Sequence, residues 1–197
     1  MNQIFSKFNL YDQVGYLLVG AITLLVVYVD FVLLDTKFPD FNATTIPVWL
    51  IVSYFFGHLI QAVANLVIRE KKGEFSDSEK SILQEAKLYF GLEKAADSEV
   101  WNLCYMLASA KDVTGHVQTF NAFYSLYRGW FVVFAIETLF IVGYTIHSYA
   151  TTKLIILLLS LALAVLFYRR LRRFNGYFRD KVLQTFLLVR TLEKDGK

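Results

Sequence analysis

A run of 22 residues, 47–68, contains no formally charged side chain. As an α-helix rising 1.5 Å per residue, this run is long enough to cross the hydrocarbon core of a bilayer, which is about 30 Å thick. Ser53 and Gly57 stand four residues apart within it, a spacing of small residues that lets another helix approach closely. The run therefore predicts a membrane-spanning helix that packs against other helices.

Four polar or aromatic side chains recur along one face of this expected helix: Tyr54, His58, Gln61 and Asn65. Their spacing of four, three and four residues puts them on a single stripe. Unpaired polar groups are costly in hydrocarbon, so we expect the stripe to face other helices, a wet cavity or a pore. Simple hydrogen bonding between helices explains such a stripe equally well.

Apolar residues make up 56% of the 197-residue chain and concentrate in four blocks, at 15–34, 47–68, 129–149 and 154–168. A soluble domain spreads its apolar residues periodically instead of collecting them in long blocks. We therefore predict an all-α, polytopic membrane protein with four transmembrane helices and a cytosolic helical layer.

The chain is expected to divide into four segments. These are a first transmembrane hairpin with a short cytosolic N-terminus (1–68), a cytosolic helical insert (69–128), a second transmembrane hairpin (129–168), and a basic, amphipathic tail helix (169–197).

The insert contains residues that are typical of helix ends. Ser76 followed by Glu79 is typical of a capping box, and Gly91 stands where a helix-terminating glycine belongs. Asp97 or Ser98 is expected to cap a second helix, and a third, starting near Val117, is expected to continue into the third apolar block. In the tail, Asn175-Gly176 is expected to break the helix.

The basic residues are distributed unevenly between the two sides of the expected membrane. The N-terminus, insert and tail together carry eighteen lysines and arginines, whereas the two remaining loops carry only Lys37 and Lys153. Cytoplasmic loops are enriched in basic residues, so both termini and the insert are expected to face the cytoplasm.

A cluster of arginines follows the last apolar block, at Arg169, Arg170, Arg172 and Arg173. Such a cluster next to a membrane helix most often contacts anionic lipid. The insert balances eight basic residues against nine acidic ones. We therefore expect lipid contact and no direct binding of nucleic acid.

Two ionisable residues are expected deep in the membrane. Glu137 lies about 12 Å from the start of its block and His58 about 16 Å from the start of its own, so both fall near the midplane. Glu137 is expected to be, in this order, a structural partner of His58 or Gln61, part of a cation pathway, or a proton relay. Asp30, one turn from a helix end, is expected to reach the interface.

The sequence contains no signature of an enzyme, a metal site or a cofactor site. A single cysteine, Cys104, excludes an internal disulfide and any multi-cysteine metal centre. The nucleotide-binding, zinc-binding and nucleophile motifs are missing. We therefore expect a non-enzymatic protein with no catalytic residue, no bound metal and no cofactor.

Several short motifs carry a resemblance to a known class of proteins: Leu10-Tyr11-Asp12, Gly15-Tyr16-Leu17-Leu18, Gly20-Ala21, Gly57-His58-Leu59, the stretch 120–128, and the arginine cluster with the aromatics after it. The chain resembles small four-helix inner-membrane proteins of bacterial antiphage defence, such as the membrane subunit of the Kiwa system or the four-helix effectors of nucleotide-signalling defence. This resemblance implies an oligomeric protein of the bacterial inner (plasma) membrane that works with a cytosolic partner.

Two functions are compatible with these features. The first is a membrane sensor or anchor that recruits or controls a cytosolic effector protein, and the second is a pore that depolarises the membrane. We expect a homo-oligomer, with a tetramer as the guessed size. The apolar face of the tail is expected either to bind a partner or to pack on the insert of its own chain; its residues are Phe178, Val182, Phe186 and Val189.

Overall fold

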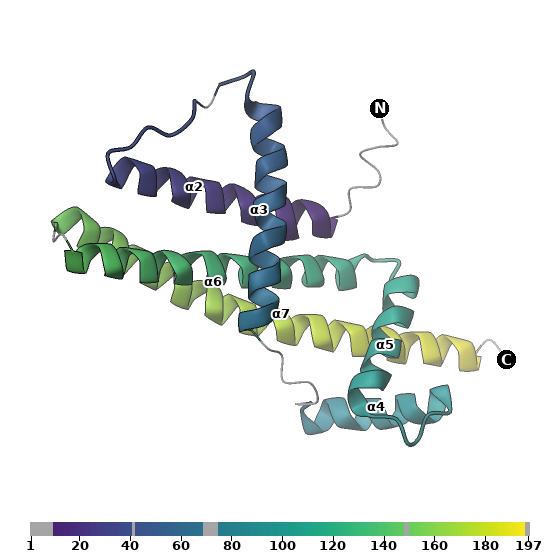
Figure 1. The fold of residues 1–197 in the computed structure, drawn as a ribbon. Helices are drawn as coiled ribbons and strands as arrows, with labels where there is room; N and C mark the ends of the chain where they lie inside the picture. Colours follow the sequence, from purple (N-terminus) through teal and green to yellow (C-terminus); the bar gives the residue numbers. More distant parts are fainter. Residues whose placement is uncertain (1–9, 41, 69–74, 148–149, 196–197) are drawn as a thin grey trace. The chain divides into compact units, whose positions relative to one another are not determined.

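The computed structural model describes residues 10–40, 42–68, 75–147 and 150–195, and this part of the chain is helical without strands, which confirms the all-α class. The elements are η1 (Asp12–Leu17), a π-helical turn, followed by α2 (Leu18–Leu33), α3 (Ile46–Val67), α4 (Asp77–Phe90), α5 (Asp97–Lys111), α6 (His116–His147) and α7 (Thr151–Asp195) (Figure 1). Four stretches are long and apolar enough to cross a membrane: Asp12–Leu33, Ile46–Val67 and parts of α6 and α7. The expected number of such helices is confirmed.

The chain forms two compact units. The first unit comprises Met1–Ile68 with Ala122–Arg173, and the second comprises Arg69–Asn121 with Phe174–Lys197. Two helices, α6 and α7, each contribute residues to both units.

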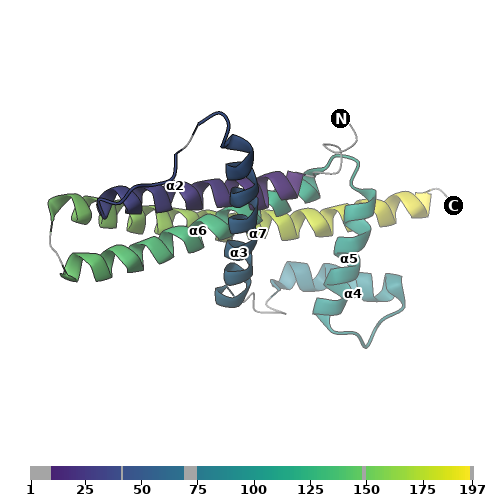
Figure 2. The same ribbon diagram turned by 45° about the horizontal axis from the view of Figure 1, so that its top comes forward.

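In the first unit, α3 crosses α2 steeply, as both ribbon views show (Figures 1 and 2). The backbones touch at glycines: a Cβ on Gly20 would lie 1.6 Å from the carbonyl oxygen of Ser53, and one on Gly57 would lie 2.0 Å from that of Tyr16. No other residue fits at either position without moving a backbone. This crossing differs from the antiparallel hairpin expected for residues 1–68, because the close contact is a point between glycines and not a long seam of interlocking side chains.

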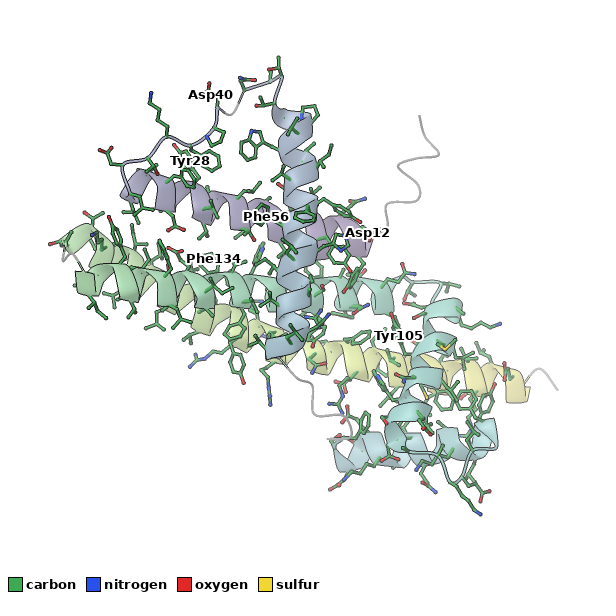
Figure 3. The ribbon with its side chains drawn as sticks, viewed as in Figure 1. Asp12, Tyr28, Asp40, Phe56, Tyr105 and Phe134 are labelled. Atoms are coloured by element: carbon green, nitrogen blue, oxygen red, sulfur yellow. The ribbon has the colours of Figure 1, made fainter. Side chains whose placement is uncertain are left out.

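An aromatic cluster closes the segment between α2 and α3. The Phe38 ring stacks on Trp49 at a centroid distance of 5.2 Å and meets Tyr28 and Phe31 edge-on, each at 5.3 Å. The Trp49 indole N–H also donates to the backbone oxygen of Asp40, at 3.4 Å. Figure 3 shows Tyr28 on α2 and Asp40 on the connecting segment.

In the second unit, α4, α5 and the end of α7 enclose a core of large apolar side chains. Its fully buried members include Leu83, Val100, Cys104, Val117, Val182, Leu183 and Phe186. Three ion pairs lie around this core, Arg179 with Glu79, Arg190 with Glu85, and Lys87 with Asp97.

Helix ends in the second unit follow the capping signals with one exception. The capping box of Ser76 and Glu79 and the left-handed Gly91 (φ 68°) are confirmed. The expected cap at Asp97 or Ser98 is wrong, because α5 begins at Asp97 with Ala96 in the capping position. The Glu99 carboxylate accepts the Ala96 N–H at 3.3 Å, and this satisfies a helix-end donor without a capping side chain at Ala96.

The two longest helices run without interruption. The continuation of the third helix into the third apolar block is confirmed, since α6 is continuous over His116–His147. The expected break at Asn175-Gly176 is wrong, since α7 is continuous over Thr151–Asp195. A β-carbon on Gly176 would meet no atom within 4 Å, so the cost there is only the low helix propensity of glycine, which tertiary packing overrides.

Candidate functional site

The buried amide of Gln61 joins three elements of the first unit. Its Nε2 donates to the backbone oxygens of Gly15 in η1, at 3.0 Å, and of Ser125 in α6, at 2.8 Å. Its Oε1 accepts from Nε and Nη2 of Arg128, at 3.2 and 2.9 Å. Both donor hydrogens and both acceptor positions of the amide are therefore used, which is what a side chain only 3% exposed requires. We call these four residues the Gln61 junction.

Glycines make room for the Gln61 junction. A Cβ on Gly129 would lie 2.7 Å from a methyl group of Val19 and 3.0 Å from Nε2 of Gln61. A Cβ on Gly15 would lie 3.0 Å from the hydroxyl oxygen of Ser125. The π-helical turn η1 lies at this junction, and such turns are frequent at functional sites.

The polar stripe of α3 is only partly buried. Gln61 is buried as expected, but His58 and Asn65 are exposed, and the buried face instead consists of Ser53, Gly57, Ile60, Gln61 and Ala64. The His58 ring stacks on Tyr16 at a centroid distance of 3.8 Å. The expectation that the stripe faces other helices, a wet cavity or a pore therefore stays a prediction for His58 and Asn65, because within one chain the glycine contact turns the Ser53–Gly57 face inward.

Two carboxyl groups meet between α2 and α6. Glu137 is 4% exposed, and its carboxyl group lies beside that of Asp30. One oxygen of Asp30, Oδ1, is buried without a hydrogen-bond partner. The structure thus brings Glu137 to Asp30, and His58 to Tyr16, so that the expected partnership of Glu137 with His58 or Gln61 is replaced.

A lysine that the sequence pattern assigns to a turn is also buried here. Lys153, in the first turn of α7, is 7% exposed, and its Nζ lies 3.5 Å from the centroid of the Tyr144 ring. The Tyr144 hydroxyl donates to the backbone oxygen of Leu33, at 3.4 Å. The sequence feature that indicated this buried face is the seven-residue spacing of Glu137 and Tyr144, which puts both side chains on one face of α6.

The arginine cluster lies at the end of the first unit. Arg169, Arg170, Arg172 and Arg173 are all exposed, while Leu171 among them is 2% exposed.

The apolar tail face is not a free surface. Val182 and Phe186 are fully buried, Val189 is 9% exposed, and Phe178 packs edge-on against Trp101 and Tyr105. The assignment of this face to a partner is therefore wrong: it packs on the helices of its own insert.

The described residues include no cluster of three or more His, Cys, Asp or Glu side chains that could hold a metal ion. Burial raises the pKa of the Cys104 thiol to about 12. Because the thiolate is the nucleophilic and metal-binding form, Cys104 is chemically unreactive where it stands.

Comparison with known proteins gives no similarity to argue from: no protein-family model matches the chain, and neither a curated protein nor a solved structure resembles it significantly.

Proposed function

We propose that this chain is an oligomeric protein of the bacterial inner membrane, with its first unit in the bilayer and its second unit in the cytoplasm. In this proposal it acts in antiphage defence as a sensor or anchor that recruits or controls a cytosolic effector protein. The defence role is supported by the sequence resemblance, and the membrane placement by the distribution of side chains.

The observation that carries the placement is the inverted polarity of the first unit. Among the described residues, seven of the eight buried polar or charged residues belong to it, including Glu137 and Lys153. Its outward side chains are large and apolar, with Ile51 71%, Leu66 75% and Leu139 73% exposed. Water would disfavour such a surface, whereas lipid favours it.

Helix orientation adds a consequence for α3. Two helices that cross steeply cannot both follow the bilayer normal. In the membrane we therefore expect α2 and α3 to be tilted differently from the bilayer normal. The contacts of Gly20 with Ser53, of Gly57 with Tyr16 and of Gln61 with Gly15 fix this crossing.

The exposed polar residues of α3 support an oligomer. His58 and Asn65 lie on the outer face of an apolar helix, where contact with hydrocarbon would be unfavourable. A second copy packed against this face would provide hydrogen-bond partners for both. A strictly monomeric mass in mild detergent would contradict the oligomer.

Continuity of α6 and α7 supports a role in coupling. Each helix extends from an apolar span into the second unit without a break, so a change at either end is transmitted through backbone hydrogen bonds instead of a loosely structured linker. This is the property expected of a sensor that reports to a cytosolic partner.

The pore remains the second candidate, and it is favoured by one observation, the buried pair of Asp30 and Glu137. Intramembrane acids commonly mark ion or proton pathways. If the chain conducts ions, Glu137→Gln should alter the conductance of reconstituted protein. If it is an anchor, that variant should keep effector capture, and changes at the exposed side chains Met106 and Leu188 of the second unit should abolish it.

Accessibility of introduced cysteines would test the placement, in a Cys104→Ala background. Labels at Gly91 and at the C-terminus should react only from the cytoplasmic side, and labels at Asp40 and Thr151 only from the opposite side. Gly91 and the C-terminus on opposite sides of the membrane would overturn the topology.

A further inference from the structure

The arginine cluster occupies one side of α7. Successive residues of an α-helix are about 100° apart, so the buried Leu171 points toward the packed interior. Arg170 and Arg172 then lie about 100° to either side of Leu171, and Arg169 and Arg173 lie nearly opposite it. All four are exposed, so four guanidinium groups present a single positively charged surface.

An aromatic layer adjoins this surface on the apolar side. Tyr168 is 44% exposed directly before Arg169. Its ring packs against Phe131 at a centroid distance of 5.3 Å, and the neighbouring Phe167 ring packs against Trp130 at a centroid distance of 5.0 Å. Aromatic side chains followed by arginines mark the level of the lipid headgroups in membrane proteins.

The sequence around the cluster carries no acidic residue. Residues 151–179 contain no aspartate or glutamate, so none of the four arginines has an acidic residue within six positions of it in the sequence. Guanidinium groups bind phosphate oxygens through paired hydrogen bonds, which a lysine ammonium cannot reproduce.

We propose that Arg169, Arg170, Arg172 and Arg173 form a binding surface for the phosphate groups of anionic glycerophospholipids. This inference rests on the proposed membrane placement and adds to it the class of lipid and the level of the cytoplasmic headgroups.

The neighbouring aromatic rings favour a lipid over a nucleic acid. Single-stranded nucleic acids bind on open aromatic faces that stack with bases. Here the Phe167 ring packs against Tyr127, Phe134 and Trp130 of α6, at centroid distances of 6.2, 5.5 and 5.0 Å, so other rings of the protein already occupy its stacking positions.

The experiment compares lipid selectivity in vesicles of phosphatidylcholine that contain spin-labelled phosphatidylglycerol or spin-labelled phosphatidylcholine. Wild-type protein should immobilise more of the phosphatidylglycerol, with the excess reduced by salt. In the variant with all four arginines changed to glutamine, the excess should fall at least fivefold, the fold-change equivalent to ~1 kcal/mol for one basic residue.

Two further variants make the result decisive. Changing the same four positions to lysine keeps the charge needed for insertion, and it should retain part of the selectivity. The matched control changes three exposed lysines of the second unit, Lys80, Lys94 and Lys111, and should leave selectivity unchanged.

Several results would overturn the inference. These are full selectivity in the glutamine variant, an equal loss in the Lys80, Lys94 and Lys111 control, and displacement of the labelled lipid by inorganic phosphate or by a single-stranded oligonucleotide. A wild-type protein that is inserted but unselective would overturn the lipid site alone, whereas a protein that fails to insert would overturn the membrane placement.

Discussion

Different kinds of contact stabilise the two units. In the first unit, small residues allow helix backbones to touch, and buried polar groups make hydrogen bonds between helices. In the second unit, large apolar side chains fill a closed core, and charged pairs stay at its surface. This difference is what the proposed membrane placement of the first unit predicts: in lipid an apolar side chain gains little by leaving the surface, so close backbone packing and hydrogen bonds stabilise the fold instead.

Enlarging a small residue should therefore damage the first unit most. Gly57→Leu should abolish the folded pairing of α2 and α3, because its Cβ alone would lie 2.0 Å from the Tyr16 backbone oxygen. Thermal unfolding in detergent would show the loss. Gly143→Leu is the matched control, since a β-carbon on that glycine of α6 would meet no atom within 4 Å; equal damage by both changes would contradict the distinction.

Truncating a large residue should damage the second unit instead. Phe186→Ala should cost about 3–5 kcal/mol, because this fully buried ring leaves a cavity in the core. Cys104, the sole cysteine, lies in the same core, so its alkylation rate in native conditions measures opening of this unit. We expect a large rise in that rate for Phe186→Ala and none for Leu188→Ala, whose side chain is 60% exposed.

Removing the amide of the Gln61 junction should have an intermediate effect. Gln61→Leu leaves the Gly15 and Ser125 oxygens and the Arg128 guanidinium without their partner. We expect a loss of about 1–3 kcal/mol in total, the typical cost of leaving a buried polar group unpaired. Thermal unfolding in detergent would measure this loss, and Asn65→Leu is the control because Asn65 lies four residues further along α3 and is exposed. A larger loss of stability in Asn65→Leu than in Gln61→Leu would show that the Gln61 junction does not join these helices.

The smallest expected effect concerns a helix end in the second unit. Ser76→Ala removes the side chain that caps α4 and should cost about 1 kcal/mol. Alkylation of Cys104 would report it as a modest rise in rate. Ser76→Asp, which keeps an acceptor at the cap, should restore the wild-type rate, and a rate for Ser76→Asp as high as that for Ser76→Ala would rule out the cap as the cause.

Features that depend on local sequence were predictable. The four apolar helices, the cap at Ser76 and Glu79, the terminating Gly91 and the unbroken α6 each follow from patterns within a few turns of helix. Single-residue signals were weaker guides, since Asn175-Gly176 does not break α7 and Asp97 does not cap α5.

Contacts between distant helices were not predictable in the same way. His58 and Glu137 each have the chemistry to pair. Their expected depth in a membrane gives only their position along the bilayer normal, and it does not give the rotation of each helix about its own axis. The contact of Gly20 with Ser53 sets that rotation, and it directs Gln61 inward and His58 outward. Asp30 then lies opposite Glu137, a pairing that no spacing within either helix could reveal.

The unbroken α7 has a consequence for how tolerant this protein is to changes in length. Both α7, with its 45 residues, and α6 are continuous helices that contribute residues to each of the two units. Deleting one residue near the unit boundary would turn every later side chain by about 100° and shift it by 1.5 Å. A deletion in α7 alone would change one of these two helical connections and leave α6 as it was, so we expect insertions and deletions to be tolerated better between α4 and α5 than at the unit boundary within α7.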